Sequence, residues 1–246
     1  MNSAPISRPA DAVLSFEKQS FDRQNSVWAL QTPNFNGLAR AYRWLEMLCF
    51  GPFLLRCRNA FLDRLAGCRK ALVIGDGDGR FTARLLAENG SIEVDALDAS
   101  SAMLSELMHN AGRHAGRVRL ELGDARAWKP DSSRYDLIVT HFFLDCLTTD
   151  EVLALAAKLH SSVGPDARWV VSEFAIPENL FGSMVARPVI TVLYRAFGIL
   201  TGLKIRSLPN HRKALDQAGF SIMQKRTWIL GLLVSELWTP NARKIS

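Results

Sequence analysis

Apolar runs and amphipathic stretches alternate along the middle of the chain. Five apolar runs have the length and composition of buried strands, at 70–75, 91–98, 117–124, 135–142 and 167–174. Three stretches with helical spacing of apolar residues lie between them, at 79–89, 100–112 and 149–164. Thr149 is the expected N-cap of the third helix. Nearly continuous apolar strands that alternate with helices predict a parallel sheet covered on both faces.

The segments on either side of this alternation have other patterns. Residues 52–68 are predicted to form one helix, because Pro52 suits a first helical turn after the break at Gly51. Residues 182–202 are very apolar and are predicted to be helical. After a short amphipathic helix at 208–219, two strands joined at Gly231 predict a terminal hairpin.

The first strand runs into the loop GDGDGR, in which glycines alternate with aspartates. The glycines are Gly75, Gly77 and Gly79. They let a ligand approach the backbone closely. A dinucleotide fingerprint would need a glycine where Arg80 stands, and Asp76 and Asp78 would repel a pyrophosphate. A calcium loop beginning at Asp76 would need a glutamate where Ala87 stands.

S-adenosylmethionine suits such a loop, because it has no phosphate and its sulfonium and ammonium groups attract carboxylates. The next strand ends in Asp98, where a carboxylate can accept two hydrogen bonds from a ribose diol, as it also does in NAD sites. After the third strand, Asp124 can accept from an adenine amino group while the Ala125 amide donates to a ring nitrogen. Each feature alone has a structural alternative, but their order at successive strand ends indicates a nucleoside.

At these residues the chain resembles the class I S-adenosylmethionine-dependent methyltransferases, from about residue 35 to 246. The segments LVIGDGDGRF, ALDASSAML and LGDAR resemble the first three motifs of that family. The resemblance implies an α/β, Rossmann-like fold with a mostly parallel seven-stranded sheet, a C-terminal antiparallel hairpin and helices on both faces. It also implies that S-adenosylhomocysteine is the product, and it adds cofactor contacts at Ala99, Met103 and Thr140.

One position departs from the family pattern. The family usually has an acidic residue two positions before the first glycine, and this chain has Val73 there. Asp76, inside the loop, is expected to contact the methionine ammonium instead. The departure leaves open a non-catalytic alternative, a cofactor-binding partner or sensor of the same fold.

The resemblance divides the chain into a flexible arm and one methyltransferase domain. The expected parts are an arm at 1–34, a helical cover at 35–69, a cofactor-binding core at 70–175, a substrate-cover insertion at 176–210, and a last helix with the hairpin at 211–246. Residues 35–62 are also similar in layout to the leader of the ubiquinone/menaquinone C-methyltransferases. That similarity makes Tyr42 a candidate lid residue over the cofactor, with ordinary packing as the alternative.

Three side chains near the strand ends are candidates for catalysis. His141 and Asp145 lie in the loop after the fourth strand, and Glu173 lies at the end of the fifth. Histidine suits proton removal at neutral pH. Alternatively, His141 contacts only the cofactor or caps a helix, and Asp145 is the N-terminal charge of the next helix. No metal site is expected.

Charge and apolar content limit the choice of acceptor and location. The net charge is +6 and basic residues are dispersed without aromatic interleaving, so a small molecule is favoured over nucleic acid. The apolar segment 183–206 contains Arg187 and Arg195 and suits a lipid- or quinone-like acceptor, with peripheral contact to an anionic membrane; packing as core is the alternative. With no spanning segment and no secretory signal, a cytoplasmic protein is expected.

Overall fold

The computed structural model describes residues 50–130, 135–177, 184, 187, 188, 190 and 208–241. All of them belong to the compact unit Asn34–Ser246. The strands are β1 Lys70–Ile74, β2 Glu93–Asp98, β3 Val118–Leu122, β4 Tyr135–His141, β5 Val163–Phe174, β6 Phe220–Trp228 and β7 Leu233–Pro240. The helices are α3 Pro52–Arg58, α4 Arg80–Glu88, α5 Ser101–Ala111, α6 Thr149–His160 and α8 His211–Gln217. Short 3-10 turns are η1 Leu62–Arg64, η2 Gly112–Arg117, η3 Leu144–Cys146 and η5 Ile229–Gly231.

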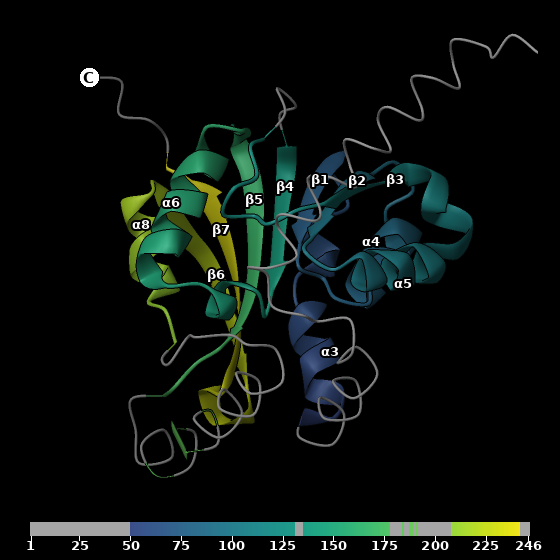
Figure 1. Cartoon of the computed structure of the whole chain (residues 1–246). Helices are drawn as coiled ribbons and strands as arrows, with labels where there is room; N and C mark the ends of the chain where they lie inside the picture. The colour runs from purple at the N-terminus through teal and green to yellow at the C-terminus, as the bar shows by residue number, and fades with distance from the viewer. Residues whose placement is uncertain are drawn as a thin grey trace, which may run out of the picture. The chain divides into compact units, whose positions relative to one another are not determined.

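The strands form one sheet in the order β3-β2-β1-β4-β5-β7-β6 (Figure 1). Strands β1 to β5 are mutually parallel, whereas β7 runs antiparallel to both β5 and β6. This arrangement confirms the predicted α/β fold and its terminal hairpin, which turns at Gly231 with a φ of +94°. The strand order reverses beside β1, and ligands of such sheets bind outside the carboxyl ends of the strands there.

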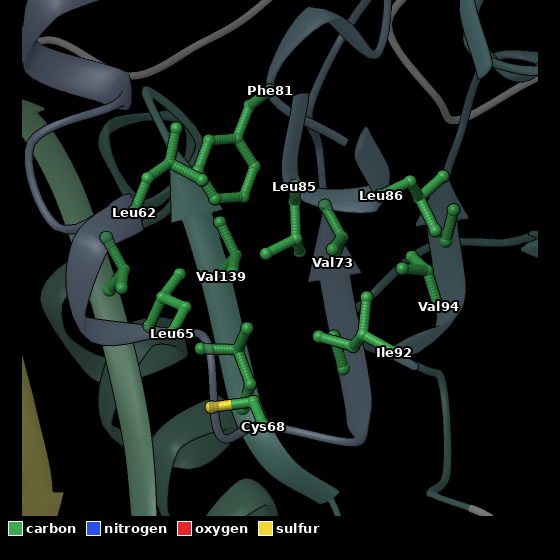
Figure 2. Close-up of a cluster of buried hydrophobic side chains, with 14 of the residues drawn as sticks. Leu62, Leu65, Cys68, Val73, Phe81, Leu85, Leu86, Ile92, Val94 and Val139 are labelled. Carbon is green, nitrogen blue, oxygen red and sulfur yellow. The ribbon is translucent and has the colours of Figure 1, made fainter. Parts of the chain in front are cut away.

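Side chains of each central strand alternate between two apolar clusters. Val73 of β1 points into the cluster beneath α4 and α5, and Figure 2 draws 14 residues of this cluster. Its neighbours Leu72 and Ile74 join the cluster on the other face, which α6 and α8 cover. In Figure 1 these two pairs of helices lie on opposite sides of the sheet. The near-continuous apolar character of the strands therefore has its cause in burial on both faces.

Several helix boundaries differ from prediction. The helix predicted over 52–68 ends at Arg58 and resumes only as the short turn η1. Leu54 and Cys57 pack in a third cluster, at the carboxyl ends of β4 and β5, whereas Phe61 and Leu65 pack beneath α4. A straight helix cannot present one face to both clusters.

The N-cap of α6 is Thr148, and the prediction of Thr149 was wrong by one residue. The Thr148 hydroxyl accepts from the Glu151 amide at 3.3 Å, and the Glu151 carboxylate accepts from the Thr148 amide at 2.8 Å. This reciprocal capping box satisfies two helix-terminal donors, which fixes the start of the helix. At its other end, α6 stops at His160 rather than at residue 164, and β5 begins at Val163.

None of the helices among the described residues is long and apolar enough to cross a membrane.

Candidate functional site

The glycines of the β1–α4 loop have three different surroundings, although φ lies between +64° and +75° at all of them. A Cβ at Gly75 would lie 2.7 Å from the Phe143 ring, and one at Gly79 would lie 2.4 Å from the Leu107 side chain. A Cβ at Gly77 would meet nothing within 4 Å. The Phe143 and Leu107 side chains therefore pack directly against the two outer glycines, which have no Cβ. The middle glycine leaves open space in which a ligand can approach the backbone.

Asp76 is buried in this loop, with 3% of its surface exposed. Its Oδ2 accepts from the Thr82 amide at 2.9 Å and from the Thr82 hydroxyl at 2.7 Å, which ties the loop to the first turn of α4. Its Oδ1 is buried and has no hydrogen-bond partner among the described residues. Burial raises the pKa of this carboxyl to about 6, against the opposing charge of Arg58. A cationic ligand would satisfy the orphaned oxygen and favour the ionised form.

Asp98 ends β2 beside this loop. Its Oδ1 accepts from the Ser100 amide at 2.8 Å, and Ser100 caps α5 by accepting from the Met103 amide at 3.3 Å. Burial raises the pKa of Asp98 to about 6, and the negative charge of Asp76 adds to the rise. Two carboxyl groups of raised pKa thus meet at the carboxyl ends of β1 and β2. Ala99, between Asp98 and the cap, is exposed.

The predicted adenine contacts are partly occupied within the protein. Both oxygens of Asp124 accept from Arg126, the shortest contact being 2.6 Å to its Nη2. Burial acts to raise the pKa of Asp124, but the hydrogen bonds and charge of Arg126 outweigh it and hold the pKa low. Ala125 is buried in the cluster beneath α6. An adenine amino group must therefore share Asp124 with Arg126.

Thr140 lies inside β4 and is fully buried. Its hydroxyl accepts from the indole Nε1 of Trp169 at 3.0 Å, so the side chain serves the packing of the sheet. Tyr42, the predicted lid residue, lies outside the described residues.

His141 ends β4 and is 2% exposed. Its ring meets the Phe81 ring edge-on, with centroids 4.5 Å apart. In the described part of the chain, neither ring nitrogen has a hydrogen-bond partner. Burial, and then the charge of Arg58, lower the pKa of His141 well below its usual range, so the ring is neutral. The next residue, Phe142, has a φ of +52°, a strained conformation for a residue with a side chain.

Glu173 shapes the loop that follows β4. Its Oε1 accepts from the Leu144 amide at 2.8 Å and from the Phe143 amide at 3.2 Å, while its Oε2 finds no partner among the residues described. Burial and then the charge of Asp145 raise its pKa well above the usual range. Burial likewise raises the pKa of the Cys146 thiol, which donates to Asp145 at 3.5 Å. Glu173 thus holds the backbone of Phe143 and Leu144. The Phe143 ring lies against Gly75, and Asp145 follows in the same loop.

Arg58, the last residue of α3, was missed by the sequence reasoning. It is 7% exposed, and its guanidinium carbon lies 5.5 Å from the centroid of the Phe142 ring. Helical spacing offers the signal that could have found it, since Leu54, Cys57 and Arg58 share one face at i, i+3 and i+4.

Residues 71–166 match the protein family described as "Methyltransferase domain". This stretch is similar to methyltransferase domains. No curated protein matches the sequence. The matched stretch contains the glycine loop, Asp98 and the loop after β4. The orphaned oxygen of Asp76 and the open space at Gly77 fit S-adenosylmethionine.

Several solved methyltransferase structures share this fold. Mitomycin 7-O-methyltransferase has a TM-score of 0.63 and 17% identity over 84% of this chain and 60% of that one. An O-methyltransferase family protein from Burkholderia thailandensis has a TM-score of 0.62 and 13% identity, again over 84% and 60%. A TehB-like SAM-dependent methyltransferase from Corynebacterium glutamicum has a TM-score of 0.55 and 16% identity over 82% and 96%. The chain spans about 60% of the first two, and the likeness establishes a class I methyltransferase fold.

Proposed function

We propose that the chain is an S-adenosylmethionine-dependent methyltransferase that acts on a small, apolar acceptor of lipid- or quinone-like character. The observation that carries the proposal is the buried carboxyl of Asp76, whose Oδ1 lacks a partner among the described residues and whose loop leaves open space at Gly77. A buried anion beside a permissive backbone suits a cationic ligand that comes close to the main chain.

The donor side is assigned residue by residue. Asp76 accepts from the methionine ammonium, in place of the acidic residue that Val73 replaces. Asp98 accepts from the ribose hydroxyls, and Asp124 with the Ala125 amide receives the adenine. When bound, the cofactor supplies an activated methyl group on a positively charged sulfur. NAD is disfavoured, because Asp76 would repel its pyrophosphate.

The acceptor side is supported by the third apolar cluster. Its described members are Phe50, Leu54, Cys57, Phe142, Phe174, Ile190, Leu232 and Leu233. They gather at the carboxyl ends of β4 and β5, next to His141. Leu230, in the hairpin turn beside this cluster, is 72% exposed and has a φ of +55°. Residues with a strained backbone conformation cluster at functional sites.

The membrane contact proposed for 183–206 is supported by two of the residues of that segment that the structure describes. Met184 is 73% exposed and Arg187 is exposed as well, whereas Ile190 is buried in the third cluster. An apolar side chain and a cation presented together suit the surface of an anionic bilayer, from which a lipid-like acceptor can be taken.

A hydroxyl oxygen is the favoured methyl acceptor, since two of the three similar structures described above are named O-methyltransferases. A hydroxyl must lose its proton during transfer, and the neutral ring of His141 or the carboxylate of Asp145 can receive it. The layout of residues 35–62 supports a second candidate, a carbon acceptor of the kind that the ubiquinone/menaquinone C-methyltransferases use. The non-catalytic alternative is not favoured, because residues 71–166 are similar to methyltransferase domains.

The test begins with calorimetric titration of S-adenosylhomocysteine and NAD. The loop offers a matched pair of variants, Asp76→Asn and Asp78→Asn. The Asp78 carboxylate accepts from Arg80 at 2.8 Å, whereas the Oδ1 of Asp76 is buried and has no partner among the described residues. We expect S-adenosylhomocysteine to bind, NAD not to bind, and Asp76→Asn to weaken binding about ten- to a hundredfold. Micromolar affinity for NAD, or an equal loss in both variants, would contradict the donor assignment.

The acceptor is tested with methyl-labelled S-adenosylmethionine and two acceptors, a prenylated hydroquinone and catechol. Mass spectrometry reports which acceptor gains the label and whether an oxygen or a carbon carries it. Transfer to the prenylated compound supports the proposal. Preferential methylation of catechol would refute an apolar acceptor while leaving the donor site intact.

A further inference from the structure

We infer that Arg58 binds the carboxylate of the cofactor's methionine end, while Asp76 binds its ammonium, so that the two side chains form a receptor for a zwitterion. The inference rests on the proposed function, because it assigns a new residue to the same donor site.

The register of the sheet places Arg58 over this site. Ile74 of β1 pairs with Thr140 of β4, so the glycine loop and the residues after β4 leave the sheet side by side. Phe142 follows β4 directly, and the guanidinium carbon of Arg58 lies 5.5 Å from its ring centroid. The cation therefore lies at the carboxyl ends of β1 and β4, beside the loop of Asp76.

The last turn of α3 is held on the sheet by polar contacts. The Ser172 hydroxyl donates to the Cys57 carbonyl at 3.3 Å, and the Cys57 thiol donates to the Val234 carbonyl at 3.4 Å. Arg58 is the next residue, and the burial of Leu54 and Cys57 keeps this face of the helix turned inward. A fixed helix end pre-organises a long side chain that would otherwise lose entropy on binding.

The charges of the site match an amino acid end. An α-amino acid carries a cation and an anion on one carbon, so its receptor needs an anion and a cation close together. Asp76 supplies a buried carboxylate oxygen that has no partner in the described chain. Arg58 supplies a guanidinium, whose planar fork binds carboxylates through two parallel hydrogen bonds. The effect of Arg58 on the pKa of both Asp76 and His141 agrees with this placement.

Two ligands that differ in a single group test the assignment. S-adenosylhomocysteine has both the amine and the carboxylate, whereas S-adenosyl-3-thiopropylamine has the amine alone. Calorimetry gives the dissociation constants of both for the wild type, Arg58→Met and Arg58→Lys. Arg56→Met is the matched control, because Arg56 is exposed on the same helix.

We expect the wild type to prefer S-adenosylhomocysteine by about ten- to a hundredfold. Arg58→Met removes that preference by weakening S-adenosylhomocysteine alone, Arg58→Lys keeps part of it, and Arg56→Met leaves it intact. Equal weakening of both ligands in Arg58→Met would show a structural counter-ion and overturn the assignment. If Arg58→Met does not fold, the wild type still decides, because lack of preference between the ligands overturns the assignment. If the wild type binds neither ligand, the donor site itself is refuted.

Discussion

Alanine substitutions at Gly77 and Gly79 should separate the folding role of the glycine loop from its binding role. Both residues have positive φ, at +64° and +75°, so an alanine at either costs about 1–2 kcal/mol of conformational strain. At Gly79 the added Cβ would also lie 2.6 Å from the Leu107 Cα, a backbone atom that can move only with α5. Overpacking of this kind adds about 1–3 kcal/mol. Gly79→Ala should therefore lose about 2–5 kcal/mol of unfolding free energy, and Gly77→Ala only the smaller part.

Ligand binding should rank the two variants in the opposite way. Nothing lies within 4 Å of a Cβ at Gly77, so in the free protein the methyl group meets open space. If the cofactor fills that space, the methyl group weakens binding about tenfold or more. Urea unfolding measures the first quantity, and calorimetry with S-adenosylhomocysteine measures the second, on folded protein. The reasoning is refuted if Gly77→Ala loses as much stability as Gly79→Ala, or if it binds S-adenosylhomocysteine like the wild type.

Four further outcomes are expected. Asp98→Ala should weaken S-adenosylhomocysteine about ten- to a hundredfold by calorimetry, and unchanged affinity would remove Asp98 from the ribose site. Because the pKa values of Asp76 and Asp98 are raised to about 6 and a cationic ligand favours their ionised forms, affinity should fall about tenfold per group between pH 7 and pH 5. An affinity that does not change between pH 7 and pH 5 would contradict the placement of both carboxyls. In the ligand-free protein the same two groups bind protons more tightly than in the unfolded chain, so their contribution to unfolding free energy should grow as pH falls from 6 towards 4. His141→Leu removes two buried ring nitrogens that lack partners in the described chain, so the substitution should not lower unfolding free energy. Turnover should fall if His141 serves the chemistry, and unchanged turnover would exclude that role. Liposomes with anionic lipid should retain the wild type and release Arg187→Glu/Arg195→Glu, and failure to retain the wild type would exclude the membrane contact.

The sheet was predictable because its determinants are local. The central strands β1 and β4 are apolar runs that end in recognisable turns, and Asp98 and the glycine loop mark the carboxyl ends of β2 and β1. The periodicity of residues 52–68 was less informative: Leu54, Cys57, Phe61 and Leu65 have the spacing of one helical face. The helix nevertheless ends at Arg58, since two different clusters compete for that face. Competition between clusters depends on tertiary packing that a single segment does not encode.

The contacts within the site were not predictable for a related reason. The sequence identified Glu173 as a carboxyl at a strand end, but the groups that occupy its Oε1 are backbone amides from the loop after another strand. Backbone amides are the same for almost every residue type and leave no trace in a sequence pattern. Arg58 was hidden in the same way, because its surroundings are formed by Phe142, a residue distant in the chain.

The attachment of α3 to later strands has a consequence for the order in which the protein is made. The last turn of α3 rests on Ser172 of β5 and on Val234 of β7, and β7 is also the strand that fills the gap between β5 and β6. A chain emerging from the ribosome exposes α3 long before β7 exists, so that helix has no complete surface to pack on until the hairpin is synthesised. The glycine loop packs on α5 and on Phe143 after β4 and bonds to Leu97 of β2, all of which are synthesised before β7, so it can form earlier. If Arg58 binds the carboxylate of the cofactor, a nascent chain can bind the nucleoside before it can bind the amino acid end. Full affinity for the cofactor is then reached only after β7 has joined the sheet.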